Sequence, residues 1–397
     1  SPVSVLGNRG PAMNDAINAV TLCQELVRIQ SVNPGGCEDK CAQFLGNLLL
    51  GGGFEVTYHD FAPGRTSVVA RKGGSRDSPR LCFAGHIDTV PLGFNDWSVE
   101  PYGGNIVEDK LYGRGATDMK SGIASFVAAA MNLGDELLAD PGVLLIMAAG
   151  EETGCEGSLA LGQELAKFVR VGAMIIAEPT YNRPMVGHRG ALWLRMTTTG
   201  KTAHGSMPEL GVNALYKAAR ATQKLEDFGF NVTPHPHLGG NSLSVGNLHA
   251  GQNVNSVPDH AVIEVDIRTI PGVRHDRLLE GFRAYLEGDI EEIEPFVNLS
   301  GVWTDPHHPW VERVYALCAA RDGERPAIAA LPFFTDASAL QPAFGGVPTV
   351  ILGPGETHMA HQTDEYCVVD NLPAAVSLYK ALWRDYLMYY KMVCIER

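Results

Sequence analysis

The chain has 397 residues, which exceeds the usual size of one hydrophobic core and predicts two domains. Its formal net charge of −14 argues against nucleic acid or an anionic membrane surface as a partner, because both attract clustered Lys and Arg side chains. A hydrophobic content of 45% with 19% charged residues is typical of a globular protein, and no apolar run approaches membrane-spanning length.

The first residues of the chain and its cysteines indicate the cellular compartment of the protein. Residues 1–13 lack the charged start and apolar core of a secretory signal, so we expect a disordered arm or a tag there. Eight scattered cysteines are too few for a disulfide scaffold in a chain of this length. Cys37 and Cys41 could suggest a zinc knuckle, but no second pair lies at a matching distance. The sequence therefore predicts a reduced, cytoplasmic setting.

Residues 1–187 show the alternation of helix and strand patterns that is typical of a layered α/β domain. Two of the strands are continuous apolar runs, as expected of strands covered on both faces of a mixed central sheet. The predicted elements are, in chain order, helices at 14–30 and about 37–52, strands at 54–61, 66–73 and 80–88, a helix at 121–138, and strands at 143–149 and 173–178.

The pattern changes near His188. Residues 188–302 follow the order β-α-β-β-α-β of a ferredoxin-like α+β unit, which predicts a domain inserted into the first one. Its elements are expected at 192–200, 211–227, 242–251, 261–270, 274–287 and 293–301. The first domain resumes over 303–397 with a helix at 309–321, a strand at 347–353 and a closing helix at 372–391.

Five imidazole and carboxylate side chains follow short strand-like runs that end in small-residue loops. They are His86, Asp118, Glu152, Glu178 and His361. Ligand sites of open α/β sheets form at strand ends, so we expect these side chains to meet. Two imidazoles with several carboxylates suit zinc, with manganese or cobalt as substitutes. The sequence predicts a hydrolytic site with two divalent ions per subunit.

Each motif also has a purely structural alternative. His86 and Asp88 point to the same face of an extended backbone, so Asp88 can orient the imidazole, but a buried histidine beside a loop carboxylate has the same pattern. Asp118 can bridge two cations about 3.5–4 Å apart or can cap the helix that follows it. Glu151 and Glu152 repel each other and need nearby cations, unless both are solvated.

The paired glutamates can divide the chemistry between them. With Glu152 as a ligand, Glu151 is free to act as the general base that moves a proton from water to the leaving amine. Three ligand carboxylates, two divalent ions and a hydroxide sum to zero charge, so an anionic substrate needs a separate cation. Arg268, at the end of a strand of the insert, is the candidate, with an ordinary surface arginine as the alternative.

Together these motifs resemble the dinuclear-zinc amidohydrolase family of acetylornithine deacetylase, succinyl-diaminopimelate desuccinylase, aminoacylase-1 and bacterial glutamate carboxypeptidase. The resemblance covers about residues 14–390 and rests on GHIDTVP, GRGATDMK, the EE pair, AEP and AHQTDE, which occur in the family's order.

The resemblance implies how the ligands are shared. His86 and Glu178 would bind one ion, His361 and Glu152 the other, and Asp118 both. It also implies a cis peptide bond after the bridging Asp118.

The insert resembles the family's dimerisation lid, which implies a homodimer. In GKTAHGSMP, His204 would enter the partner's active site and help to polarise the scissile carbonyl. The FFTDAS segment, with Asp336, resembles a pocket loop in which two phenylalanines replace small residues, whereas His358 fits no motif and is interpreted as a loop residue. The implied substrate contacts are Asn255, Arg268, Thr335, Gly353 and Gly355.

The sequence thus predicts a metal-dependent hydrolase that cleaves an amide bond in a small anionic N-acyl amino acid or peptide, in the manner of a deacetylase or desuccinylase. A hydroxide that bridges two zinc ions would attack, with Glu151 as general base and Asp88 in support. One alternative is a carboxypeptidase, a dipeptidase or a hydrolase of another small C–N bond. Another is an inactive binding homologue, against which the intact ligand set and Glu151 count. The acyl group depends on a few pocket contacts.

Overall fold

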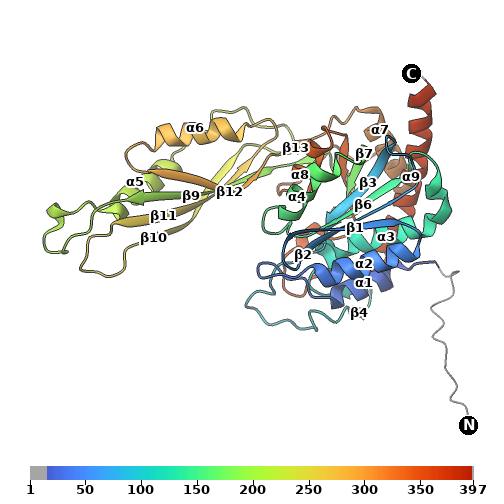
Figure 1. Ribbon diagram of the computed structural model, residues 1–397, viewed down its shortest axis with the longest axis horizontal. Coiled ribbons are helices and arrows are strands. Elements are labelled where there is room, and N and C mark those ends of the chain that lie inside the picture. Colours follow the sequence, from blue (N-terminus) through green and yellow to red (C-terminus); the bar gives the residue numbers. More distant parts are fainter. Residues whose placement is uncertain (1–15, 396–397) are drawn as a thin grey trace, which may run out of the picture.

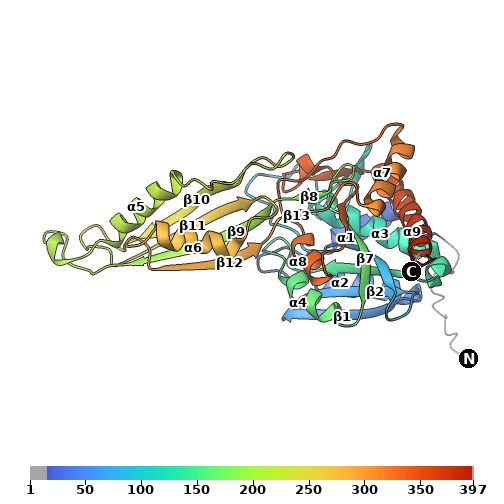
Figure 2. The ribbon, with the colours of Figure 1, turned by 90° about the horizontal axis from the view of Figure 1, so that it is seen from above.

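The chain forms a helix-covered mixed sheet and a second, four-stranded sheet that projects from one side of it (Figures 1 and 2). The computed structural model describes residues 16–395. The arm or tag expected at 1–13 lies outside the described residues.

The first sheet has six strands in the order β1-β2-β6-β3-β7-β14. β1, β2 and β6 pair antiparallel, whereas β6, β3, β7 and β14 pair parallel, so the predicted mixed α/β sheet is confirmed. The six strands are β1 (Glu55–Ala62), β2 (Arg65–Lys72), β3 (Pro79–His86), β6 (Val143–Ala148), β7 (Arg170–Ile176) and β14 (Thr349–Ile351).

Alternate residues of these strands enter two different cores. On β6, Leu145 and Met147 pack under one group of helices, whereas Leu144 and Ile146 pack under the other. Every residue of β6 is buried, which explains why its sequence is a continuous apolar run. The first face is covered by α1 (Ala19–Arg28), α2 (Asp39–Gly51), α3 (Ser121–Leu133), α7 (Pro309–Asp322) and α9 (Asn371–Ile395), and the second by α4 (Glu156–Leu165) and α8 (Ala337–Ala343).

The second sheet is built from the insert, residues 188–302. Its strands pair antiparallel in the order β10-β11-β9-β12, which is the ferredoxin-like arrangement of a β-α-β-β-α-β chain. Both helices pack on one face, where Leu192, Leu194 and Ile263 meet Ala218 and Phe282. The elements are β9 (Gly190–Thr199), α5 (Ala214–Glu226), β10 (Ser242–Ala250), β11 (His260–Thr269), α6 (His275–Tyr285) and β12 (Glu292–Leu299).

The two chain crossings between the sheets lie side by side. β8 (Gly187–His188) pairs antiparallel with β13 (Val302–Trp303), and Val302 lies opposite His188. β8 and β13 thus lie where the sequence analysis places the limits of the insert, and the division into domains stays a prediction. A third small sheet, with the order β15-β5-β4, consists of β4 (Ile106–Val107), β5 (Lys110–Tyr112) and β15 (Tyr366–Val368).

The predicted helix at 121–138 is shorter in the structure. α3 ends at Leu133 because Gly134 adopts a left-handed φ of 55°, and a 3-10 turn continues to Leu138. None of the helices within residues 16–395 is long and apolar enough to cross a bilayer. The cytoplasmic location stays a prediction.

Candidate metal centre and active site

Three parallel strands deliver four acidic or imidazole side chains to one edge of the central sheet. His86 is the last residue of β3, Glu151 and Glu152 follow β6, and Glu178 follows β7. Because β6, β3 and β7 are neighbours in the sheet, their carboxyl ends lie together. This is the edge at which open α/β sheets bind ligands.

Asp118 and His361 reach this edge from longer loops. Asp118 follows β5 of the small sheet and lies in the turn Ala116–Lys120 before α3. The peptide bond after it is cis, as the resemblance implies. His361 lies well beyond the end of β14, in a loop where it adopts a φ of 62°. The prediction that all five side chains sit at strand ends is therefore wrong for His361.

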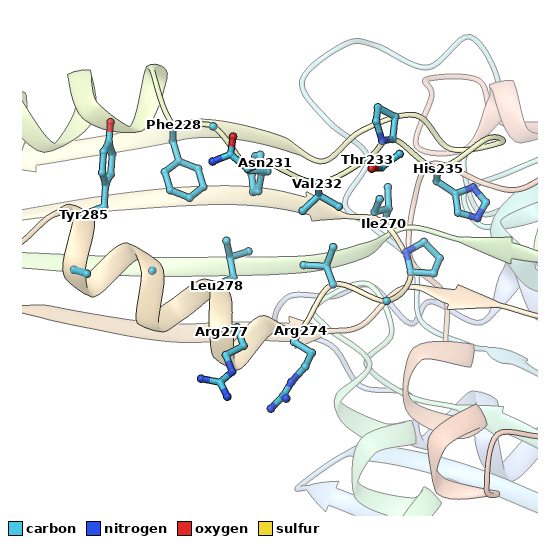
Figure 3. A pocket seen from close by; sticks show the side chains of 18 of the residues that line it. Phe228, Asn231, Val232, Thr233, His235, Ile270, Arg274, Arg277, Leu278 and Tyr285 are labelled. Carbon is cyan, nitrogen blue, oxygen red and sulfur yellow. The ribbon is translucent and has the colours of Figure 1, made fainter.

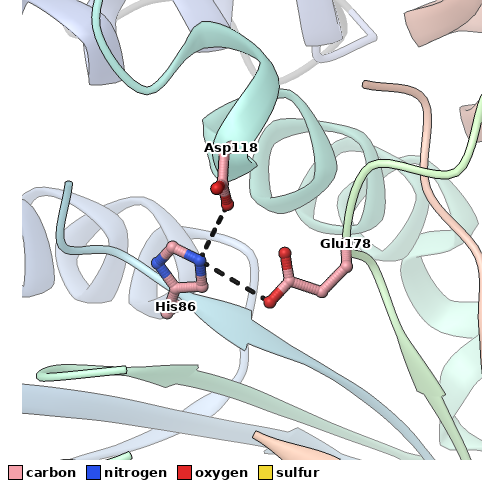
Figure 4. Close-up of side chains that lie close together, drawn as sticks. All are labelled: His86, Asp118 and Glu178. Carbon is pink, nitrogen blue, oxygen red and sulfur yellow. Dashed lines mark hydrogen bonds and ion pairs between the residues drawn. The ribbon is translucent and has the colours of Figure 1, made fainter. Parts of the chain in front are cut away.

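The structure brings three groups of possible metal ligands together, and two of them share Asp118. In the first group, His86 Nε2 lies 3.1 Å from Asp118 Oδ1 and 3.6 Å from Glu178 Oε1 (Figure 4). In the second group, His361 Nε2 lies 3.2 Å from Asp118 Oδ2 and 3.1 Å from Glu152 Oε2. The two oxygens of one carboxylate thus face two different histidines.

Glu151 lies beside the first group. Its Oε2 is 3.6 Å from His86 Nε2, and its side chain is buried. It also forms a third group of possible metal ligands with His86 and Glu152, whereas the two groups that share Asp118 do not include it. Its role in proton transfer stays a prediction.

The clustered carboxylates and imidazoles have strongly shifted pKa values. Burial raises the pKa of Glu151 and of Glu178 well above the usual range. Burial alone would lower the pKa of His86, but the charges of Glu151 and Glu178 outweigh it and raise that pKa. Hydrogen bonds to Asp118 and Glu152 raise the pKa of His361 to about 10. Burial and the neighbouring charges thus shift the pKa values of the carboxylates and of both histidines.

This donor set fits two divalent cations. Within residues 16–395, no Lys or Arg forms an ion pair with the five predicted ligands or with Glu151. Buried carboxylates without a cationic side chain are stabilised by metal ions. Oxygen and imidazole nitrogen atoms are also the donors that such ions prefer.

Asp88 supports the cluster differently from what its sequence position predicts. His86 Nδ1 donates a hydrogen bond to the backbone carbonyl of Asp88 at 2.9 Å, whereas the Asp88 carboxylate is 3.4 Å away. That carboxylate accepts the backbone N–H groups of Glu151 and Glu152, both at 3.1 Å. Asp88 therefore fixes the imidazole through its backbone and the paired glutamates through its side chain.

Glu365 is a supporting residue that the sequence analysis missed. Its buried carboxylate accepts the backbone N–H groups of Gly115 at 2.9 Å and of Thr117 and Asp118 at 3.0 Å. It also pairs with Arg114 Nη1 at 2.7 Å. These bonds hold the loop that carries Asp118. The only signal in the sequence is its place in the AHQTDE motif.

The glycines predicted to line the pocket pack tightly against ligand-bearing backbone. A Cβ atom on Gly353 would lie 2.4 Å from the carbonyl oxygen of Glu178, and one on Gly355 would lie 2.3 Å from that of Thr117. Both positions therefore require glycine for close approach. Substrate contact by these two glycines stays a prediction.

Thr335 and Asp336 of the return segment are buried. Thr335 has no exposed surface, and its hydroxyl donates to His188 Nε2 at 3.0 Å. Asp336 accepts from Ser158 Oγ at 2.7 Å. The Thr335 hydroxyl is thus already engaged, and a substrate contact by it stays a prediction. His358 lies in the 3-10 turn Thr357–Met359, outside all three metal-ligand groups.

The predicted residues of the insert fall at opposite ends of its sheet. Arg268 and Ala191 pair at the end nearest the central sheet, whereas His204 pairs with Ser256 beyond the other end. β9 and β11 have 10 residues each. At about 3.3 Å per residue, the sheet is about 30 Å long. Asn255 lies beside His204, and its backbone carbonyl accepts the N–H of Gly205 at 2.8 Å.

A cavity of about 1190 Å³ lies away from this cluster, between α6 and the loop at residues 227–236 (Figure 3). Its lining is mainly apolar, with Phe228, Val232 and Leu278. Arg274 and Arg277 point away from these side chains and pair with acidic residues of their own helix (Figure 3). The cavity therefore lacks the convergent polar groups of a catalytic site.

The sequence matches a known peptidase family, and the fold matches solved structures. The model of peptidase family M20/M25/M40 matches residues 82–385, and the chain belongs to this family. Succinyl-diaminopimelate desuccinylase 2 of Ruegeria sp. is 30% identical over 393 residues, covering 95% of this chain and 97% of that protein. Acetylornithine deacetylase of Vibrio campbellii is 29% identical, covering 82% of this chain and 86% of that protein.

Solved structures share the same fold. The M20 family metallo-carboxypeptidase Sso-CP2 from Sulfolobus solfataricus has a TM-score of 0.78 at 17% identity, covering 93% of this chain and 99% of that one. A dinuclear metal binding peptidase from Bacillus subtilis, YXEP, has a TM-score of 0.68 at 19% identity, covering 93% of this chain and 98% of that one.

Proposed function

We propose that this protein is a metal-dependent hydrolase that cleaves the amide bond of a small N-acyl amino acid. The observation that carries the proposal is the position of Asp118 between two imidazoles, with one carboxylate oxygen toward each. Family relatives named as a desuccinylase and a deacetylase support the same kind of substrate.

The five ligands would hold two ions. His86 and Glu178 would bind one ion, His361 and Glu152 the other, and Asp118 both. Divalent ions in these places supply Lewis acidity and lower the pKa of water. We propose zinc, because it accepts imidazole nitrogen together with carboxylate oxygen, with cobalt or manganese as substitutes.

Glu151 would move the proton. Its carboxylate lies beside His86, and burial raises its pKa, which favours holding a proton between two steps. Glu151 would accept that proton from the attacking water and then deliver it to the nitrogen of the leaving amine. Asp88 keeps Glu151 in place through the backbone N–H of that residue. Arg268 would bind the substrate carboxylate.

Two alternatives differ in their observable products. A carboxypeptidase or dipeptidase would use the same side chains on a peptide bond, and the structural likeness to Sso-CP2 leads us to retain it. An inactive homologue would bind ligands without turnover, and the complete ligand set with Glu151 disfavours it.

A substrate panel tests the proposed function. We expect protein loaded with zinc, cobalt or manganese to release free amino acid from at least one N-acetyl or N-succinyl amino acid, and chelator-treated protein to release none. Product formation would be followed by chromatography. Hydrolysis of dipeptides alone would favour the peptidase alternative, and no hydrolysis with any metal would contradict the proposal.

We also propose that the insert forms a homodimer that completes each site. His204 is exposed, and its Nδ1 accepts the backbone N–H of Ser206 at 3.1 Å, which leaves Nε2 as a free donor. An N–H donor can stabilise an oxyanion. Because the sheet of the insert separates His204 from Arg268 by about 30 Å, we infer that a second copy brings His204 to the metal ligands.

Mixed dimers test this arrangement. Glu151→Gln and His204→Ala proteins are each expected to be nearly inactive. After subunit exchange they should regain activity, because one site of each mixed dimer would have both groups intact. Exchange would be verified by mass spectrometry of differently tagged subunits. No recovery despite verified exchange would mean that His204 acts within its own subunit or outside catalysis.

A further inference from the structure

We propose that Trp193 and Phe334 form an apolar wall beside Arg268, so that the preferred substrate carries an apolar or aromatic side chain on the amino acid with the free carboxylate. This inference rests on the proposed function and specifies its substrate class. Trp193 and Phe334 together make up this aromatic wall.

The aromatic wall is assembled from both parts of the chain. Trp193 lies on β9 of the insert, whereas Phe334 lies in the segment before α8. The ring centroids are 6.2 Å apart, with an interplanar angle of 71°. The guanidinium of Arg268 lies 5.5 Å from the Trp193 ring and 5.9 Å from the Phe334 ring. A ligand on this guanidinium therefore lies close to both rings.

Asp266 fixes the direction in which Arg268 can bind. Its carboxylate accepts hydrogen bonds from Arg268 Nε at 2.8 Å and from Arg268 Nη2 at 3.1 Å. The same carboxylate accepts the indole N–H of Trp193 at 2.8 Å. Within residues 16–395, Arg268 Nη1 makes no hydrogen bond, which leaves the outer edge of the guanidinium for a substrate carboxylate. Asp266 and Trp193 are thus positioning residues for Arg268.

The aromatic wall adjoins the turn that carries the proposed base. Cys155 packs with Trp193 and Phe334 in one apolar cluster. The backbone N–H of Cys155 donates to the carbonyl of Glu151 at 3.1 Å, and its thiol lies 3.6 Å from the carbonyl oxygen of Thr335. A substrate held by Arg268 would therefore extend from the aromatic wall toward Glu151.

The charges of this region disfavour a charged side chain on the substrate. A substrate ammonium over the two rings would meet the positive charge of Arg268 that already lies there. A second carboxylate, on the substrate side chain, would gain little binding energy from Arg268, because Asp266 already pairs with this arginine. Apolar groups gain from the removal of ring and substrate surface from water, and aromatic groups gain further from ring contacts.

Substrate preference tests the inference directly. We expect kcat/KM for N-acetylphenylalanine and N-acetylleucine to exceed that for N-acetylornithine and N-acetylglutamate by about 10-fold or more, the range that apolar pocket contacts provide. Phe334→Ala should lower kcat/KM for N-acetylphenylalanine by about 10-fold and change that for N-acetylalanine by less than about 3-fold. Phe334→Leu should retain most of the activity toward N-acetylleucine.

Phe296→Ala is the matched control. Phe296 is an exposed ring 6.1 Å from Trp193 that lies under Arg195 instead of Arg268. This variant should keep the wild-type preference. An equal loss of kcat/KM on all substrates in Phe334→Ala would overturn the inference but not the proposed function. A preference of the wild-type protein for the charged substrates would have the same consequence. No hydrolysis of any N-acyl amino acid by the wild type would overturn the proposed function and the inference with it.

Discussion

Replacing Glu151 by glutamine should abolish most turnover while both metal ions stay bound. The amide has nearly the same shape as the carboxylate but cannot accept a proton from the attacking water. General-base catalysis contributes about 10²–10⁴-fold, so kcat should fall at least that far. The fold should persist, because Glu151 is fixed by a backbone hydrogen bond to Asp88 that this substitution leaves intact.

The Glu151→Gln experiment needs a rate and a metal count. Steady-state kcat and elemental analysis would be measured on the same preparation. Glu164→Gln is a matched control, because Glu164 is exposed and pairs with Lys167 on the surface. Near-normal turnover with Glu151→Gln would assign the proton transfer to another group, and loss of metal would make Glu151 a ligand.

Replacing Asp118 by alanine should remove activity by disrupting both metal positions together. One oxygen of Asp118 faces His86 and the other faces His361, so a single substitution deletes a donor from each group. Loss of a residue that only supports a metal ligand costs about 10–100-fold in affinity or activity. Loss of the shared ligand Asp118 should therefore lower both the metal affinity and the activity by more than about 100-fold.

Calorimetric zinc titration of metal-free protein would measure the effect of Asp118→Ala. Asp77→Ala is the control, since Asp77 is an exposed loop carboxylate. We expect two tight sites in the wild type and in Asp77→Ala, and greatly weakened binding at both in Asp118→Ala. If one site kept its wild-type affinity in Asp118→Ala, the carboxylate would not be shared.

The fold was largely predictable because its strands and helices carry strong periodic patterns. All six strands of the central sheet and all six elements of the insert lie where the sequence predicts them. Two helices over the second face were missed. α4 contains Gly157 and Gly162, and α8 is short and contains Pro342, so neither has the propensity or length that identifies a helix from sequence.

The candidate metal ligands stand out in the sequence for a different reason. Acidic residues directly after buried apolar strands, such as Glu152 and Glu178, have no simple packing role, and this singles them out. The residues that hold them in place give no such signal. Glu365 binds the backbone around Asp118 from a position far along the chain, and only the tertiary fold brings the two together. For the same reason, the burial of Thr335 was not foreseen.

The aromatic wall illustrates the same limit of local patterns. Trp193 and Phe334 come from different domains of the predicted organisation and are joined by no sequence motif. Their contact with Arg268 depends on how β9 of the insert meets the segment before α8. Substrate preference is therefore a property of the assembled structure.

The most direct test of the account is the position of the metal ions in crystals of zinc-loaded protein. Anomalous diffraction recorded on both sides of the zinc absorption edge locates zinc without assumptions about its ligands. We expect two peaks per chain, one contacting His86 and Glu178, the other contacting His361 and Glu152, and both contacting Asp118. A single peak at full loading, or peaks at other residues, would contradict the account.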